Sequence, residues 1–262
     1  MAGVKQVREV LSVIADLASI GSALAIGFLA LALTTFNAAN RPGAQQRAPQ
    51  ASSAQRPSVL VPVDGIDTTM NPTAIRPSSA RVAIVEFGDF ECPFCGRYAR
   101  EVYPKLKREY IDTGRVAYAF RHFPLKSIHP FAMTAAQAAE CSAEQGRYWQ
   151  MHQRLFAEPG RLSQAVVRAQ VAAVGLDHAR FDACLSKAPA AQIGADQTEG
   201  LRLGIRTVPT FLVGRLLPTG SIDVRWRLSG AGADGAIRSA IDQLLAIPDA
   251  QDRESRTKAR RE

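Results

Sequence analysis

The sequence has few cysteines, few lysines and few histidines for its length. Four Cys among 262 residues are too few for a small disulfide scaffold. Only six of the 32 basic residues are Lys. An excess of Arg can reflect genome composition as readily as phosphate binding, so the net charge of +8 does not predict a nucleic-acid partner. With 47% hydrophobic and 21% charged residues, the chain is neither wholly disordered nor collagen-like, and its length predicts one or two domains.

Metal-ligand spacing and internal repeats are also absent from the sequence. The four histidines, His122, His129, His152 and His178, show no spacing typical of a metal site, so we expect no metal. We expect His152 to pack within a helical stripe rather than to take part in catalysis. The absence of an internal repeat excludes solenoid folds.

Charge is missing from one long stretch near the N-terminus. Residues 17–36 include no charged side chain, and about 20 helical residues cross a hydrocarbon core about 30 Å thick. A cleaved signal peptide has an apolar core of only about 7–15 residues, and Asn37 makes a poor cleavage site. We therefore expect residues 1–36 to hold an uncleaved signal anchor in the lipid bilayer. A cleaved signal peptide and a buried soluble helix are the alternatives.

Composition divides the rest of the chain into three parts. Residues 37–57 are rich in Pro, Gln, Ala and Ser with almost no large apolar side chain, which predicts a flexible, disordered linker. We expect a folded domain over 58–248 and a charged, disordered tail over 249–262.

Strand and helix signals alternate along the expected domain. Apolar or alternating runs predict strands at 59–63, 81–87, 115–121, 209–213 and 222–228. Helical periodicity predicts helices at 93–110 and 233–247, and a block of helices over 127–200 that is broken near 159–160, 175 and 189. This order predicts an α/β fold with a helical block in its middle.

The motif Cys92-Pro93-Phe94-Cys95 follows a predicted buried strand and opens a helix. Unpaired backbone N–H groups and the helix dipole stabilise negative charge at a helix N-terminus, so the first thiol has a lowered pKa and forms the reactive thiolate. We therefore predict that Cys92 is the nucleophile and that Cys95, one turn later, is the resolving thiol. Half a zinc site and a purely structural disulfide are the alternatives.

Residues 85–95 (VEFGDFECPFC) resemble the active-site segment of DsbA-like thiol:disulfide oxidoreductases of the thioredoxin superfamily. Residues 204–211 (GIRTVPTF) resemble the cis-proline loop of that family, and residues 146–156 resemble its helical insertion. The resemblance covers about residues 80–246. It implies a thioredoxin fold with a helical domain inserted at about 127–200, thiol–disulfide exchange, and no bound cofactor.

Two further site residues follow from the resemblance. Pro209 matches the cis-proline that packs against the active-site disulfide and leaves the preceding backbone free to pair with substrate. An ordinary trans proline is the alternative. Glu86 matches the buried acid of the family, whose raised pKa lets it pass a proton to or from Cys95, unless the strand register turns it outward.

The residues expected to meet the substrate are Pro93, Phe94 and Val208. The Pro-Phe dipeptide departs from the Pro-His of the best-known oxidases, and a Phe side chain cannot stabilise the thiolate as His does. Val208 resembles the oxidases, whereas the disulfide isomerases usually have Thr there. We expect Asp89 and Glu91 to be exposed, where water screens their effect on the thiolate.

Some DsbA-like proteins have a second, structural disulfide, which implies that Cys141 and Cys184 pair within the helical block. Two separate buried thiols are the alternative. A persistent disulfide would indicate an oxidising compartment.

These observations predict a membrane-anchored thiol:disulfide oxidoreductase that donates disulfides to the thiols of exported proteins. We expect a single-pass protein of the cytoplasmic (inner) membrane, with its catalytic domain in the periplasm or outside the cell. A membrane redox partner of the DsbB or vitamin K epoxide reductase type is expected to reoxidise it. A reductase or isomerase of the same fold is one alternative, and a copper-binding thioredoxin-fold chaperone is the alternative from a different class.

Overall fold

The computed structural model describes residues 61–63, 67–157, 160, 162–187 and 189–248, all within one unit that spans residues 55–262. The uncharged stretch at 17–36, the expected linker at 37–57 and the expected tail at 249–262 lie outside the described residues. Within the part that the structure describes, no helix is both long and apolar enough to cross a membrane.

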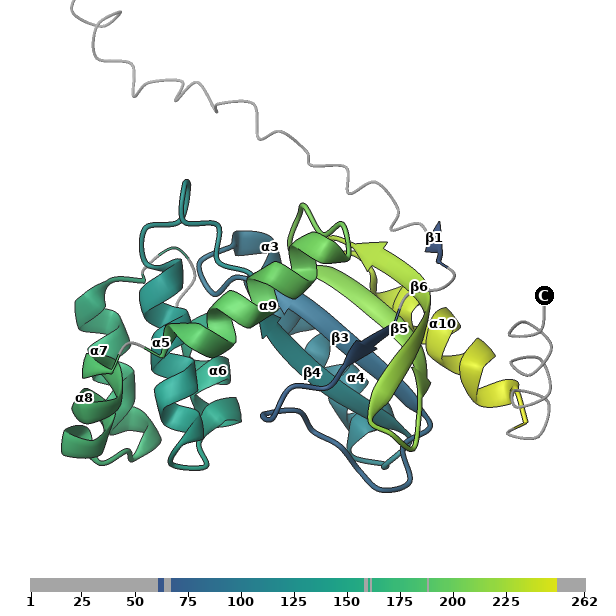
Figure 1. Cartoon of the computed structure of the whole chain (residues 1–262), viewed down its shortest axis with the longest axis horizontal. Helices are drawn as coiled ribbons and strands as arrows, with labels where there is room; N and C mark the ends of the chain where they lie inside the picture. The colour runs from purple at the N-terminus through teal and green to yellow at the C-terminus, as the bar shows by residue number, and fades with distance from the viewer. Residues whose placement is uncertain (1–60, 64–66, 158–159, 161, 188, 249–262) are drawn as a thin grey trace, which may run out of the picture. The chain divides into compact units, whose positions relative to one another are not determined.

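The described residues form one mixed sheet of six strands (Figure 1). In spatial order its strands are β1 (Val61–Pro62), β6 (Ser221–Ser229), β5 (Thr210–Leu216), β3 (Val82–Gly88) and β4 (Val116–His122), and β2 (Asp67–Thr69) also pairs with β6. Strands β3 and β4 run parallel, whereas β5 is antiparallel to both β3 and β6. A parallel pair requires a crossover connection, and the helices after β3 supply it.

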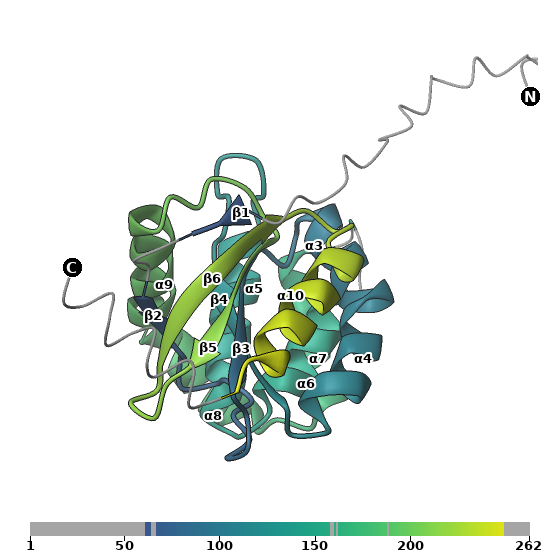
Figure 2. The ribbon, with the colours of Figure 1, turned by 90° about the vertical axis from the view of Figure 1, so that its right-hand side faces the viewer.

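Helices lie on both sides of this sheet and at one end of it. The crossover from β3 to β4 consists of α3 (Pro93–Glu101), α4 (Tyr103–Leu106) and the π-helical turn η1 (Lys107–Ile111). Between β4 and β5 the chain forms α5 (Ala132–Ala143), α6 (Tyr148–Phe156), α7 (Gln164–Val174), α8 (His178–Ser186) and α9 (Ala190–Arg202), and α10 (Asp234–Ala246) follows β6. Figure 1 shows α5 to α8 grouped at one end, and Figure 2 shows α10 and α4 on one side of the sheet with α9 on the other.

The central strand β3 is buried along its whole length. Its side chains alternate between two cores, because successive residues of a strand point to opposite faces. Val85 and Phe87 pack in the core shared with the inserted helices, and Val82 and Ile84 pack in the core shared with α4, η1 and α10. Two covered faces explain the continuous apolar run that predicted this strand.

The helix predicted over 93–110 is interrupted at Val102. Pro104 has no backbone N–H, and its ring clashes with the carbonyl group of Arg100 in a continuous α-helix. The chain therefore restarts as α4 and continues as η1. Strand β2 was not predicted, since its sequence has no apolar run and it forms by pairing with the start of β6.

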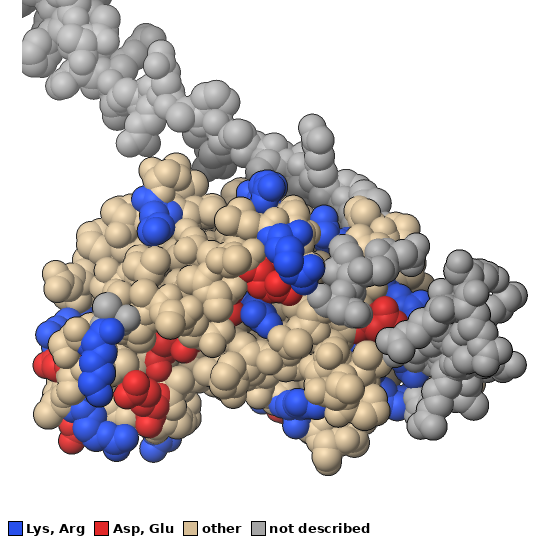
Figure 3. Space-filling model, in the orientation of Figure 1, with Lys and Arg blue, Asp and Glu red and all other residues tan. Residues whose placement is uncertain are grey.

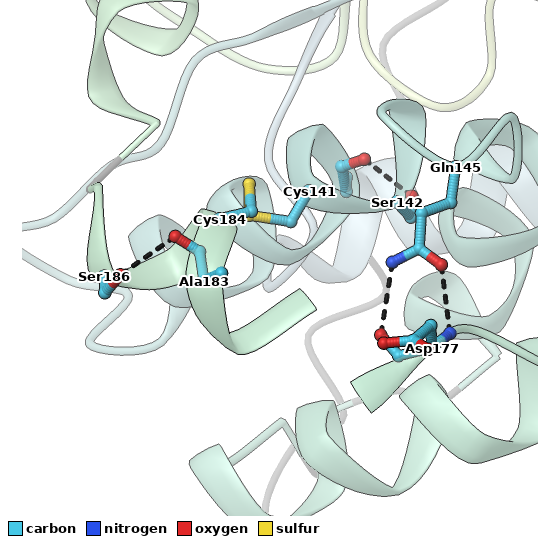
Figure 4. The surroundings of a disulfide bond; sticks show 8 residues. Cys141, Ser142, Gln145, Asp177, Ala183, Cys184 and Ser186 are labelled. Atoms are coloured by element: carbon cyan, nitrogen blue, oxygen red, sulfur yellow. Dashed lines mark hydrogen bonds between the residues drawn. A yellow bond between two sulfur atoms is a disulfide. The ribbon is translucent and has the colours of Figure 1, made fainter. Parts of the chain in front are cut away.

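A disulfide joins Cys141 of α5 to Cys184 of α8, with an S–S distance of 2.07 Å (Figure 4). This is the pairing that the resemblance implied. Nearby, Gln145 Nε2 donates to the Asp177 carbonyl group at 3.3 Å, and the Asp177 N–H group donates to Gln145 Oε1 at 2.9 Å. The disulfide thus joins α5 to the last turn of α8, and the Gln145–Asp177 hydrogen bonds hold the start of α8 beside the residues that follow α5.

The positive charge of the chain is spread over the surface that Figure 3 shows. Lys and Arg side chains lie there in separate groups, with Asp and Glu among several of them. Some basic side chains of the described residues are paired locally, as Arg202 is with Glu199 at 2.7 Å and Arg225 with Asp223 at 2.8 Å. This face therefore has no continuous basic surface.

Replacing either half of the disulfide should destabilise the domain as much as replacing both. Cys141→Ala, Cys184→Ala and the double variant each remove a covalent link across 43 sequence positions, so each should lower the free energy of unfolding by about 2–4 kcal/mol. Urea denaturation under oxidising conditions measures this. If the decreases in free energy of unfolding of the two single variants add up to the decrease of the double variant, the two cysteines do not act as one stabilising cross-link.

Candidate functional site

The two free cysteines lie where β3 ends and α3 begins. Cys92 is the N-cap residue of α3, and Pro93 follows at the first helical position, where its missing N–H costs no hydrogen bond. The Cys92 N–H group donates to the Asp89 carbonyl group at 3.1 Å, which fixes the turn between strand and helix. Cys95 lies one turn later and is completely buried, whereas Cys92 keeps 5% of its surface exposed.

The two thiols differ strongly in proton affinity. The pKa of Cys92 falls from its ordinary value of 9.0 to about 6, mainly through a hydrogen bond from the Cys95 side chain and, against the effect of burial, through the N–H groups of Cys95 and Phe94. Burial raises the pKa of Cys95 well above 9.0, and Cys92 and Glu86 add to that rise. At neutral pH Cys92 is therefore mainly a thiolate and Cys95 a neutral thiol.

A cis peptide bond joins Val208 to Pro209 at the start of β5. The Val208 carbonyl oxygen lies 3.7 Å from Cys92 Sγ. Two hydrogen bonds hold the loop, from Thr210 Oγ1 to the Thr207 carbonyl group at 2.7 Å and from the Gly230 N–H group to the Pro209 carbonyl group at 2.8 Å. The antiparallel pairing of β3 with β5 brings this loop to the end of β3, so residues 116 positions apart meet at one sulfur.

The middle of the motif is its exposed part. Pro93 is exposed, and Phe94 keeps 43% of its surface in solvent. The Arg97 guanidinium lies 5.9 Å from the centre of the Phe94 ring. An apolar, partly cationic surface therefore adjoins the nearly buried Cys92, whose thiolate is stabilised mainly by the Cys95 thiol and also by backbone amides, rather than by the side chains of Pro93 and Phe94.

Glu86 points into the interior beneath the cysteines. The carboxyl group is 1% exposed, and the Tyr118 hydroxyl of the adjacent strand donates to its Oε2. Burial raises the pKa of Glu86 to about 8, although the Tyr118 hydrogen bond lowers it, and the Cys92 charge adds to the rise. The strand register turns this side chain inward, so it has the burial expected of an acid that exchanges protons with Cys95.

Asp89 is not exposed as expected; it is only 2% exposed. Its carboxylate accepts hydrogen bonds from the N–H groups of Glu91 and Leu125, each at 2.8 Å, and contacts His129 Nδ1 at 2.7 Å. The Asp89 charge raises the pKa of Cys92, and water screens this effect little because the carboxylate is buried.

The expectation of exposure fails for Glu91 as well, because this side chain is half-buried. Its Oε2 accepts a hydrogen bond from the Phe131 N–H group at 2.7 Å. Asp89 and Glu91 together tie the turn before Cys92 to the loop that precedes α5. The sequence carries no local signal for these bonds, since the partner residues lie 36 to 40 positions later.

His152 packs among aromatic rings, as expected. Its ring centre lies 4.7 Å from that of Phe120 and 4.9 Å from that of Phe156. Burial, together with nearby His122, lowers the pKa of His152 to about 3, so the ring is neutral. Among the residues that the structure describes, no group of three or more His, Cys, Asp or Glu side chains is placed to hold a metal ion.

Comparison with known proteins gives one family and several partial relatives. A family model described as Thioredoxin matches residues 69–222. The Na(+)/H(+) antiporter NhaA 1 of Salinispora arenicola is 36% identical over 149 residues, which are 56% of this chain and 22% of the antiporter. The antiporter NhaA 3 of Salinispora tropica is 37% identical over 138 residues, 52% of this chain and 21% of that protein. The chain thus spans about a fifth of the length of these curated relatives.

Several solved structures share the architecture. α-DsbA1 of Wolbachia pipientis has a TM-score of 0.58 at 22% identity, and the match covers 67% of this chain and 92% of the α-DsbA1 chain. Oxidised BdbD of Bacillus subtilis has a TM-score of 0.57 at 19% identity, and the match covers 70% of this chain and 99% of the BdbD chain. DsbA2 of Pseudomonas aeruginosa has a TM-score of 0.52 at 26% identity, and the match covers 68% of this chain and 96% of the DsbA2 chain. The predicted fold, a thioredoxin-type sheet with an inserted helical domain, is confirmed.

Asp89→Asn should lower the pKa of Cys92 below about 6, because it removes a buried negative charge that opposes the thiolate. The pH dependence of Cys92 alkylation measures this pKa. Glu91→Gln is the matched control, since its side chain bonds the same loop. An equal shift in both variants would mean that the loop's position, rather than the Asp89 charge, sets the acidity of Cys92.

Glu86→Gln should stabilise the oxidised protein increasingly as the pH rises from about 4.5 toward the Glu86 pKa, which lies below about 8 when Cys92 has no charge. In this window unfolded Glu86 is ionised while the folded residue keeps its proton, so the wild-type free energy of unfolding falls with rising pH. The variant lacks this penalty, and its advantage should reach on the order of a few kcal/mol near pH 8. Urea unfolding at both ends of the window measures it, and a constant difference would refute a raised Glu86 pKa.

Proposed function

Because this chain belongs to the thioredoxin family, we propose that it is a thiol:disulfide oxidoreductase in which Cys92 is the nucleophile and Cys95 the resolving thiol. The contrast between the two thiols carries the proposal. Cys92, at the N-cap of α3, has a pKa lowered to about 6, while burial raises that of Cys95 one turn away. The two sulfur atoms hold the exchanged electrons, so the reaction requires no bound cofactor.

In the oxidising direction, a substrate thiolate attacks Sγ of Cys92 in the Cys92–Cys95 disulfide. The bond between the two cysteines breaks, and Cys95 leaves as a thiolate that takes a proton from the Glu86 carboxyl group. A second substrate thiolate then attacks the substrate sulfur of the mixed disulfide, and Cys92 leaves as a thiolate stabilised by the N–H groups of Phe94 and Cys95. The substrate loses two electrons to the cysteine pair.

We infer that the protein donates disulfides rather than reducing them. Stabilising the Cys92 thiolate stabilises the reduced form, which makes the disulfide a stronger oxidant. Buried Glu86, whose pKa is raised, can supply a proton to the departing Cys95 thiolate and take it back in the reverse step, so it serves both directions. A reductase or isomerase would use the same cysteines, so the reduction potential decides between them.

Substrate contact is assigned to the surface around Cys92. The Val208 carbonyl oxygen, 3.7 Å from Cys92 Sγ, supports pairing of the substrate backbone with this loop. Exposed Pro93 and Phe94 supply an apolar surface next to the nucleophile.

The proposed substrates are the thiols of exported proteins. The uncharged stretch at 17–36 supports an anchor in the cytoplasmic (inner) membrane, with the domain in the periplasm or outside the cell. The Cys141–Cys184 disulfide supports an oxidising compartment. A membrane partner of the DsbB or vitamin K epoxide reductase type would reoxidise the cysteine pair.

The reduction potential of Cys92–Cys95 tests the direction of exchange. We expect it to be more oxidising than the value of about −270 mV for thioredoxin and to approach the value of about −120 mV for DsbA. The full chain is equilibrated in glutathione buffers and its thiols are trapped, with peptide mass mapping to distinguish the Cys141–Cys184 pair. A potential at or below that of thioredoxin would contradict disulfide donation and indicate a reductase.

Two variants test the activity itself. Cys95→Ser should accumulate a mixed disulfide at Cys92, whereas Cys92→Ser should form none. Failure of Cys95→Ser to trap any substrate thiol would overturn the assignment as an oxidoreductase.

A further inference from the structure

One hydrogen bond distinguishes Tyr118 among the residues that surround Glu86. Tyr118 lies on β4, which runs parallel to the strand of Glu86 and pairs with it directly. Its hydroxyl donates to Glu86 Oε2. Both side chains are buried, so this bond forms away from competing water.

The second carboxyl oxygen of Glu86, Oε1, does not take part in this hydrogen bond. Glu86 Oε1 is buried and has no hydrogen-bond partner in the described structure. Glu86 Oε1 lies near Gly88, since a Cβ atom added to Gly88 would be 3.4 Å from this oxygen. Gly88 is the last residue of β3, and the turn before Cys92 follows it. Because Oε2 already accepts the Tyr118 hydroxyl, Oε1 is the oxygen available to take up or release a proton.

Tyr118 is itself held firmly in place. Its backbone exchanges two hydrogen bonds with Ile75, each at 2.8 Å. The Tyr118 ring packs against Tyr103, with centroids 4.9 Å apart, and against Trp149 at 5.8 Å. Trp149 is fixed in turn by a hydrogen bond from its Nε1 to the Thr73 carbonyl group at 2.9 Å. The donor to Glu86 is therefore a rigid one.

The ionisable groups that act on Glu86, or on which it acts, are thiols and phenols from four elements. They are Cys92 at the N-cap of α3, Cys95 and Tyr98 of α3, Tyr103 of α4, Tyr118 of β4 and Tyr148 of α6. The Tyr103 hydroxyl is buried without a hydrogen-bond partner in the described structure. Tyr103 and Tyr118 thus offer a comparison between a phenol that bonds the carboxyl group and an adjacent phenol that does not.

We propose that Tyr118 is a positioning residue for thiol–disulfide exchange, whose hydroxyl orients Glu86 so that Oε1 exchanges the proton of Cys95. The inference rests on the proposed function. When Cys95 attacks Sγ of Cys92 in a mixed disulfide, its proton passes to the Glu86 carboxylate, the Cys92–Cys95 bond forms, and the substrate thiolate leaves. In the opposite direction the proton returns to Cys95.

A disulfide reagent that releases a coloured aromatic thiolate separates the two chemical steps. The full chain is used with Cys92 and Cys95 reduced and Cys141–Cys184 intact. The first thiolate is released when Cys92 attacks the reagent, and the second when Cys95 attacks the resulting mixed disulfide. Stopped-flow absorbance across a pH series gives a pH profile for each step.

The second step should depend on Tyr118, and the first should not. In the wild type the second rate should rise with pH through an inflection below about 8, because Cys92 is neutral in the mixed disulfide and no longer raises the pKa of Glu86. Tyr118→Phe should move this inflection upward by about one pH unit, as loss of a hydrogen bond to a charged group implies. The second step at neutral pH should then slow several-fold.

Two control variants isolate the hydroxyl. Tyr103→Phe, which removes an adjacent hydroxyl that bonds nothing in the described structure, should leave both profiles unchanged. Glu86→Gln should abolish the inflection. An unshifted inflection in Tyr118→Phe, or an equal shift in Tyr103→Phe, would overturn the role of Tyr118. Absence of the second release from the wild type would instead overturn the proposed function.

A measurement on the wild type covers the case in which Tyr118→Phe does not fold. With tyrosine labelled at the ring carbon that bears the hydroxyl, the NMR signal of Tyr118 should titrate with the midpoint of Glu86 and lose this transition in Glu86→Gln. A Tyr118 signal that does not respond to Glu86 would refute the inference.

Discussion

The scarcity of water around ionisable groups determines how this site is built. Glu86, Asp89 and Cys95 are buried, and Cys92 is almost so. Without solvent, the charge that each group bears depends on the hydrogen-bond donors within reach. Cys92 has backbone N–H groups at the start of α3 and can hold a negative charge, whereas Cys95, deeper in the same helix, cannot. The difference in proton affinity between two chemically identical thiols follows from where they lie.

The sheet places the two cysteines and the groups that act on them. β3 places Glu86 in the core and leads into the turn before Cys92, while β4 on one side supplies Tyr118 and β5 on the other follows directly after Pro209. Register therefore matters more than sequence distance. A shift by one residue in either pairing would turn Glu86 away from Tyr118 or move the Val208 carbonyl group away from Cys92.

Much of this arrangement could be predicted from local sequence. The C-x-x-C motif at a helix start predicted the lowered pKa of Cys92, and an apolar run around Glu86 predicted a buried strand. The interruption at Val102 was missed because the apolar periodicity continues past Pro104. The burial of Asp89 was missed for a different reason: its partners Leu125 and His129 belong to a distant loop, and a carboxylate between a strand and a helix usually remains in water. The bond from Tyr118 to Glu86 likewise depends on parallel pairing, which no local pattern encodes.

The Cys141–Cys184 disulfide must itself be formed by thiol oxidation, the reaction that this protein is proposed to carry out on other proteins. A newly made chain has four thiols, and two of them must be oxidised before α5 and α8 are joined. The formation of this disulfide thus requires an electron acceptor outside the chain. Under reducing stress the supply of mature protein would fall together with its activity, so synthesis alone could not restore the population.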